Sequence, residues 1–135
     1  MPNHYHFLVE VRSFEFSHAM QNFSISSIKA INKHYKRSGA LYQGAFQAKI
    51  VEQNPYLLHL SRYIHLNPVS AGLVDVPEDW EYSSYREFVG LTSTLPQPDI
   101  VLNQFQVPDA NRSELYRQFV EDIQDEKIIV DVLFD

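Results

Sequence analysis

The sequence predicts an α+β protein. Residues 5–12 alternate imperfectly between apolar and polar types and are rich in residues that favour strands, and residues 48–51 form a second, shorter run of this kind. Between these runs and after them, apolar residues recur at the three- to four-residue spacing of amphipathic helices. Two strands in a chain that is otherwise helical indicate a mixed fold.

The first half of the chain should form two helices. Ser17 is a suitable N-cap for a helix over about 17–37, which Ser38-Gly39 would end. A second helix is expected over 55–66, because Asn54 can cap it and Pro55 suits the first helical position. Pro68 should stop it, since the residue before a proline is driven away from the helical conformation.

The second half should be loop-rich and then helical. We expect an ordered loop over 75–84, a short helix over 84–90 and a linker over 92–99. An amphipathic helix follows over about 109–125, and the final apolar run, 128–134, predicts a strand or a frayed end. The apolar side of the long helix would hold Leu115, Phe119 and Ile123.

Composition narrows the possible functions. The chain has 135 residues, of which 44% are hydrophobic and 21% charged, as in ordinary globular domains. It contains no cysteine, which excludes disulfides, thiolate metal sites and cysteine nucleophiles. Its apolar runs are too short to span a bilayer, and its N-terminus does not resemble a signal peptide. We therefore expect a soluble, cytoplasmic protein with no membrane partner.

The charge is unevenly distributed. The formal charge is −6, which argues against a nucleic-acid partner. Residues 1–73, however, hold seven Lys or Arg against three acids, whereas residues 74–135 hold four against fourteen. A polyanion would therefore bind the first half. The alternative is that the acidic half only aids solubility.

Two histidines stand close together in the first predicted strand. His4 and His6 are two residues apart, so a strand would project both imidazoles from one face, where they could hold a divalent metal. Two histidines leave such a metal short of ligands, so a third ligand must come from elsewhere. The alternative is a chance pair on a half-exposed strand.

Tyr63 and Asn67 lie four residues apart in the second predicted helix, on one face of it. A tyrosine hydroxyl beside a metal-bound phosphate can attack phosphorus, and an amide oxygen is a suitable ligand for Mg²⁺ or Mn²⁺. The alternative is that Tyr63 is a core aromatic residue and that Asn67 only caps the helix before Pro68.

Basic residues gather near the end of the first predicted helix. Residues 33–37, KHYKR, combine cations with an aromatic ring, which suits a phosphate backbone and an unstacked base. The alternative is a solvated helix end. The chain has no glycine-rich phosphate loop, no Gly-x-Ser-x-Gly motif and no His-Glu-x-x-His pair.

Four segments together resemble the conserved boxes of one family. They are MPNHYHFLV with its His-hydrophobe-His pattern, SGALYQGAF against Gly-x-Leu-Trp-Gln-x-Arg-Phe, RYIHLNPVSAGLV against Tyr-Ile-x-x-Asn-Pro-Val-Arg-Ala-Gly, and EDWEYSSY against Trp-Ser-Ser-Tyr. In this order and spacing, over roughly residues 1–90, the chain resembles the single-tyrosine transposases of the HUH class. The similarity is to the branch with the REP-associated tyrosine transposases.

The resemblance implies metal-dependent cleavage and joining of single-stranded DNA hairpins, as in DNA transposition. His4, His6 and Asn67 would hold Mg²⁺ or Mn²⁺. Tyr63 would attack the scissile phosphate and form a 5′-phosphotyrosine, leaving a free 3′-hydroxyl. The DNA contacts would come from Lys29, Lys33, Lys36, Arg37, Lys49 and Arg62.

The resemblance also implies a ferredoxin-like core. Residues 1–91 would form an incomplete version of it, without the family's first strand and helix, and residues 92–135 an acidic, helical extension. An incomplete sheet exposes an edge, through which a homodimer could form. Ala45 and Ser70 stand where the family usually has arginine. The alternative function is therefore a catalytically inactive, DNA-hairpin-binding remnant of a transposase.

Overall fold

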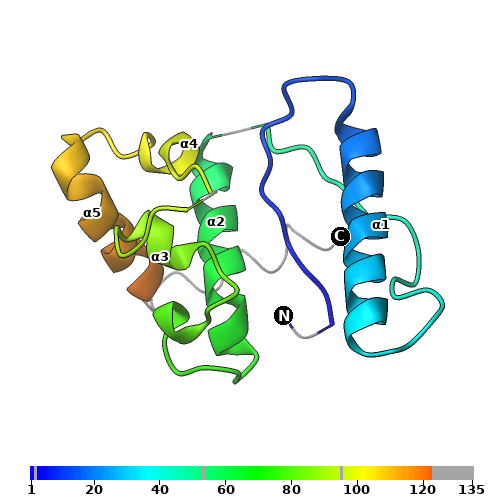
Figure 1. Ribbon diagram of the computed structural model, residues 1–135. Coiled ribbons are helices and arrows are strands. Elements are labelled where there is room, and N and C mark those ends of the chain that lie inside the picture. Colours follow the sequence, from blue (N-terminus) through cyan, green and yellow to red (C-terminus); the bar gives the residue numbers. More distant parts are fainter. Residues whose placement is uncertain (2, 53, 95, 123–135) are drawn as a thin grey trace. The chain divides into compact units, whose positions relative to one another are not determined.

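The computed structural model describes residues 1, 3–52, 54–94 and 96–122, and within these it contains helices but no strand (Figure 1). In chain order the elements are α1 (Phe16–His34), α2 (Asn54–Ser70), the 3₁₀ helix η1 (Pro77–Asp79), α3 (Tyr85–Phe88), α4 (Asp99–Leu102) and α5 (Asp109–Glu121).

The chain divides into two compact units. Leu8–Ile50 forms the unit that we call the α1 unit, and Met1–Phe7 with Val51–Asp135 forms the α2 unit. The sequence predicted a different boundary, between a core over residues 1–91 and an extension over 92–135. That boundary stays a prediction.

The predicted α+β fold with an incomplete ferredoxin-like core is wrong for the part of the chain that the structure describes. Residues 5–12 and 48–51, the two expected strands in this part, have no regular secondary structure. An alternating pattern favours an extended backbone, but a strand also needs a neighbour that accepts and donates its backbone hydrogen bonds. The homodimer through a sheet edge stays a prediction, and the expected strand over 128–134 lies outside the described residues.

The helix expected over 17–37 is confirmed as α1, which ends three residues earlier. The N–H of Arg37 donates to the carbonyl of Asn32 at 2.9 Å, and that of Lys36 donates to the carbonyl of Lys33 at 3.4 Å. This is the Schellman pattern that ends many helices. Lys36 takes the positive φ of 50° that the pattern requires, a position usually held by glycine. The chain therefore turns before Ser38-Gly39.

The α1 unit buries little apolar surface. Met20 is its only buried hydrophobic residue, and Phe16 contacts Phe46 edge-to-face at a centroid distance of 5.8 Å. Large apolar side chains remain exposed in this unit, namely Val9, Val11, Phe14, Phe23, Ile25, Tyr35, Phe46 and Ile50. This unit therefore has a small core. Because apolar burial is the main stabilising contribution to folding, it gains little stability from such burial.

The second helix is confirmed as α2, but the prediction that Pro68 stops it is wrong. The helix continues to Ser70, because the fixed φ of proline is helical and only one backbone donor is lost. It ends in a second Schellman motif at Gly72, whose φ is 67°. There Leu73 N–H donates to the Pro68 carbonyl and Gly72 N–H to the Val69 carbonyl, both at 2.9 Å. Asn67 is therefore a helical residue.

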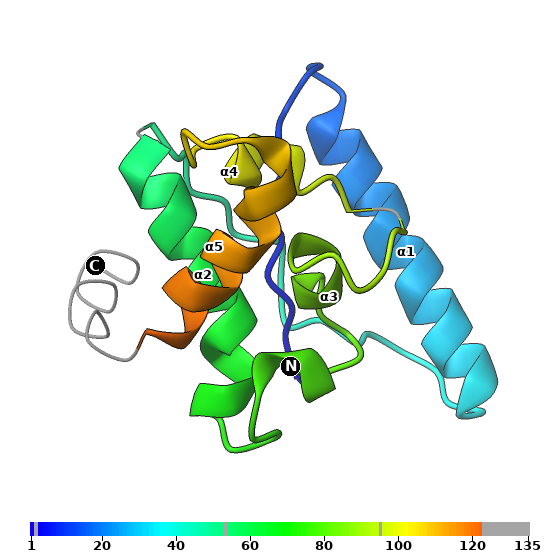
Figure 2. The ribbon, with the colours of Figure 1, turned by 90° about the vertical axis from the view of Figure 1, so that its left-hand side faces the viewer.

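The α2 unit holds most of the buried core. Its longest helix, α2, packs against η1, α4 and α5, and α3 packs against η1 and α5 (Figures 1 and 2). α4 begins at Asp99, the last residue of the segment that the sequence predicted as a linker. The short helix expected over 84–90 is confirmed as α3. Among its described residues, the buried apolar side chains include Tyr85, Phe88, Val101, Leu102, Tyr116 and Val120.

α5 confirms the helix expected from residue 109 and ends at Glu121. Its buried positions are Tyr116 and Val120, whereas Leu115 and Phe119 are half-buried. The buried face is therefore rotated from the predicted one, because it follows the packing of α5 against α2 and α3. Ile123 lies outside the described residues.

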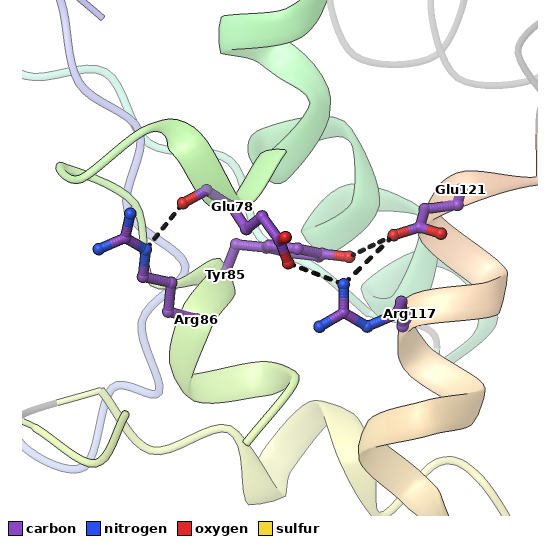
Figure 3. Close-up of polar contacts among 5 residues, drawn as sticks. All are labelled: Glu78, Tyr85, Arg86, Arg117 and Glu121. Atoms are coloured by element: carbon purple, nitrogen blue, oxygen red, sulfur yellow. Dashed lines mark hydrogen bonds and ion pairs between the residues drawn. The ribbon is translucent and has the colours of Figure 1, made fainter. Parts of the chain in front are cut away.

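A polar cluster fastens η1 to α5 (Figure 3). Arg117 forms ion pairs with Glu78 at 2.8 Å and with Glu121 at 3.5 Å, and the Tyr85 hydroxyl donates to Glu121 at 3.4 Å. Burial and then the nearby Glu121 carboxylate raise the pKa of Tyr85 to about 12. Arg86 donates to the backbone carbonyl of Glu78 at 2.7 Å. The cluster thus joins the 75–84 loop to the last turns of the chain's described part.

No helix among the described residues is long and apolar enough to cross a membrane.

Candidate active site

The N-terminal residues of the α2 unit lie against one face of α2. Tyr63 and Asn67 are one turn apart on that face, and both are half-buried. The ring centroids of His6 and Tyr63 are 5.9 Å apart with an interplanar angle of 72°. The Asn67 side-chain amide donates to Nε2 of His6 at 3.3 Å. The structure therefore brings together three residues that are distant in the sequence or separated by a helical turn.

His4 lies beside His6, with ring centroids 5.0 Å apart and the planes nearly perpendicular. Nδ1 of His4 donates to the side-chain oxygen of Asn3 at 2.7 Å, so its Nε2 carries the lone pair. In His6 the lone pair is also on Nε2, since that nitrogen accepts from Asn67. The sequence did not single out Asn3, because an asparagine at a chain end carries no periodic signal.

Burial lowers the pKa of His6, and the nearby His4 and N-terminal ammonium lower it further. Desolvation disfavours the charged imidazolium, and neighbouring positive charge does the same. His6 is therefore neutral near pH 7, which is the form in which an imidazole binds a metal.

The geometry of the donors fits a divalent metal. Two ligand atoms that each lie about 2.1 Å from one metal are themselves about 3 to 3.5 Å apart. Nε2 of His6 and the Asn67 amide nitrogen are 3.3 Å apart, and a half-turn about the Cβ–Cγ bond would present the amide oxygen instead. The described residues contain no group of three or more His, Cys, Asp or Glu suited to a metal. The candidate donor set would therefore be two imidazoles and an amide, and water or phosphate oxygens would have to complete the coordination.

Five of the six predicted DNA-contacting residues lie in the α1 unit and are exposed, namely Lys29, Lys33, Lys36, Arg37 and Lys49. Lys29 and Lys33 lie four residues apart on one face of α1, and Lys36 follows just after the end of the helix. Residues 8–50 contain six Lys or Arg and two Glu, which gives this unit a formal charge of +4. A polyanion would be attracted to this unit.

Arg62, the sixth predicted contact, lies elsewhere. It is 1% exposed and donates from Nε to the Val120 carbonyl at 3.2 Å and from Nη2 to the Asp122 carbonyl. Its guanidinium carbon lies 5.6 Å from the centroid of the Phe119 ring. A guanidinium with these partners holds the end of α5, and we leave it out of the DNA-contacting surface proposed below.

Comparison with known proteins bears on the same residues. The family model described as "Transposase IS200 like" matches residues 1–67, a stretch that contains His4, His6, Tyr63 and Asn67. A protein of Haemophilus influenzae named as a REP-associated tyrosine transposase is 27% identical to the chain. The match covers 66% of this chain and 57% of that relative, so the chain spans little more than half of the relative's length. No solved structure matches the chain.

The match to the family model ends at Asn67 and so includes His6 and the three residues near it, and the relative is also named as a transposase. Over residues 1–67 the chain is thus similar to the IS200-like transposases.

Proposed function

We propose that this protein cleaves and rejoins single-stranded DNA, with Tyr63 as the nucleophile and a divalent metal bound by His4, His6 and Asn67. The observation that carries the proposal is the convergence on His6 of the Asn67 amide at 3.3 Å and the Tyr63 ring at 5.9 Å. The similarity to the IS200-like transposases supports it, because the match to the family model includes all four residues.

The two imidazoles and the amide would suit Mg²⁺ or Mn²⁺, because these ions accept few protein ligands and keep several water or phosphate oxygens. When bound, it would supply Lewis-acid polarisation of the scissile phosphate. Asn3, which accepts from Nδ1 of His4, would fix the tautomer and orientation of that ligand. Asn67, in contrast, donates to Nε2 of His6, the nitrogen that would bind the metal. Its side chain would therefore have to turn so that the amide oxygen, and not the amide N–H, faces the ion.

Tyr63, in the middle of α2, would act as the nucleophile. Its hydroxyl oxygen would attack phosphorus, and the bond from phosphorus to the 3′ oxygen would break. The phenol loses one proton and the leaving 3′ oxygen gains one, so the step consumes neither protons nor an external energy source. The 5′-phosphotyrosine keeps the energy of the broken bond, and attack by a 3′-hydroxyl would rejoin the strand.

The first test is a covalent adduct. Labelled single-stranded hairpin oligonucleotides with Mn²⁺ should give a protein–DNA band on a denaturing gel, and Tyr63→Phe should abolish it, because a phenyl ring has no oxygen to attack phosphorus. Tyr56→Phe is the matched control, since Tyr56 lies two turns earlier in the same helix, and it should retain the band. An adduct that survives in Tyr63→Phe would contradict the assignment.

The proposed DNA surface makes a separate prediction. Replacing Lys29, Lys33 and Lys36 together by glutamine should weaken binding of single-stranded DNA. The slope of log K against log salt should become shallower by about 2, since each lost phosphate contact to a single strand contributes about 0.7. Filter binding from low to moderate salt measures this slope. Arg112→Gln, which removes a cation already paired with Asp109 in the α2 unit, should leave it unchanged, and an equal effect of both variants would refute the surface.

A second candidate function is hairpin binding without cleavage. What favours it is that Ala45 and Ser70 stand where the resemblance to the transposase boxes implies arginine, so two expected cations are absent. Salt-sensitive DNA binding with no adduct under any Mn²⁺ concentration would select this function over the first.

A further inference from the structure

α2 carries two different sets of polar side chains on opposite sides. Residues in an α-helix are about 100° apart, so Tyr63 lies about 200° from Ser61 and again about 200° from His65. One side, with Tyr63 and Asn67, faces His6. The other side, with Ser61 and His65, is buried against α5 and the start of α3. Any rotation of α2 would therefore disturb both sides together.

The buried side forms one continuous hydrogen-bonded chain. Nδ1 of His65 donates to the Tyr116 hydroxyl at 2.7 Å, which donates to Oγ of Ser61 at 3.0 Å. Ser61 donates onward to the Leu58 carbonyl at 2.8 Å, and Ser84 donates to Nε2 of His65 at 3.0 Å. In this order each hydroxyl hydrogen and each imidazole nitrogen has one partner. Ser61, His65 and Tyr116 are at most 2% exposed.

Such a series of hydrogen bonds specifies the position of α2 more sharply than apolar packing does. A shift of α2 by one residue would move His65 and Ser61 away from the Tyr116 hydroxyl. Each buried polar group left without a partner destabilises the fold, whereas apolar surfaces that slide past one another lose much less. The Tyr116 ring is itself held by Phe88, Phe105 and Phe119, whose ring centroids lie 4.9 to 6.4 Å away. This packing holds the Tyr116 hydroxyl in one place, and its hydrogen bonds to Ser61 and His65 therefore limit the rotation of α2.

We propose that Tyr116 and His65 are positioning residues of the candidate active site: through α2 they hold Tyr63 and Asn67 toward His6. The inference rests on the proposed function of Tyr63 as nucleophile. It assigns α5, which lies outside the region matched by the transposase model, a direct part in shaping the site.

The experiment compares two buried tyrosines. Tyr116→Phe keeps the ring and removes the hydroxyl that joins His65 to Ser61. Tyr85→Phe is the matched control, because Tyr85 is equally buried but its hydroxyl donates to Glu121 and not to α2. Single-turnover adduct formation should slow about tenfold or more in Tyr116→Phe, the usual consequence of a small displacement of a reacting group. It should stay at the wild-type rate in Tyr85→Phe, with DNA affinity unchanged in both.

A second measurement does not depend on cleavage. Mn²⁺ affinity, followed by electron paramagnetic resonance in the absence of DNA, should weaken about tenfold in Tyr116→Phe, as for residues that orient metal ligands, and should not change in Tyr85→Phe. Circular dichroism at the assay temperature verifies that each variant is folded. Should Tyr116→Phe fail to fold, Ser61→Ala, which removes the acceptor of the same hydroxyl, takes its place with the same expected results.

The outcomes separate the two proposals. If the wild type forms no adduct, the proposed nuclease function fails, and the Mn²⁺ comparison alone decides whether Tyr116 positions Asn67. If the wild type forms an adduct and Tyr116→Phe matches it in both rate and Mn²⁺ affinity, the positioning role is overturned. Equal slowing in both tyrosine variants would also overturn it, because general loosening of the core would then suffice.

Discussion

Arg62→Ala is expected to lower the free energy of unfolding of the α2 unit by about 3 kcal/mol, through lost hydrogen bonds and a new cavity. α5 ends at Glu121, and the last carbonyls of any helix lack partners within it and carry partial negative charge. Arg62 reaches from α2 to two carbonyls at this end, those of Val120 and Asp122. Its loss would leave the buried end of α5 without this cap.

The control lies at the other end of α5. Arg112 pairs with Asp109 at 2.5 Å, but the Asp109 side chain is 88% exposed. Arg112 also donates to the Val107 carbonyl at 3.1 Å and to the Asn103 side chain at 2.5 Å. Arg112→Ala should therefore cost about 1 to 2 kcal/mol, still less than Arg62→Ala, because its carboxylate partner is exposed to water. Urea unfolding followed by the fluorescence of Trp80, the chain's single tryptophan, reports on the α2 unit. If Arg62→Ala and Arg112→Ala cost the same, Arg62 does not cap α5.

The second large effect expected is a loss of stability in mild acid. Burial lowers the pKa of His65 from 6.5 to about 3. The unfolded chain therefore takes up a proton at His65 below about pH 6.5, whereas the folded chain stays neutral there down to about pH 3. Because the unfolded state binds more protons in this window, stability falls as the pH falls through it. The slope approaches about 1.4 kcal/mol per pH unit.

From pH 7 to pH 5 this group should remove about 2 kcal/mol from the free energy of unfolding. The measurement is urea unfolding at several pH values, again followed by Trp80. His65→Gln should flatten the dependence by that amount relative to the wild type, whatever its own stability. His18→Gln replaces an exposed histidine of α1 and should leave the dependence unchanged. An unaltered slope in His65→Gln would show that His65 is not kept neutral by burial.

The helices were largely predictable because their signals are local. The N-cap and proline at 54–55 and the spacing of apolar residues predicted α1 and α2 near their observed positions. The i, i+4 pair Tyr63 and Asn67 was also predictable, since helical geometry alone places such residues on one face. α4 was not, because its four residues lie at the edge of a segment rich in Pro and Thr, whose composition indicates a linker.

The burial of Arg62 could not be predicted from its neighbours in the sequence. On the sequence Arg62 is one of several cations in the basic half of the chain. Its burial depends on α5, which lies more than fifty residues further along the chain. The predicted strands fail for the same kind of reason, because a strand requires a hydrogen-bonded neighbour that an alternating pattern cannot specify.

By itself the sequence determined the helical segments, the basic first half, the His4–His6 pair and the Tyr63–Asn67 pair, all of which follow from spacing and composition over a few residues. Only the tertiary structure decided that His6 meets Asn67 and Tyr63, that Arg62 is buried, and that His65 and Tyr116 connect α5 to the far side of α2. The physical reason is that hydrogen bonds and burial depend on which distant segments pack together, and packing is a property of the whole chain.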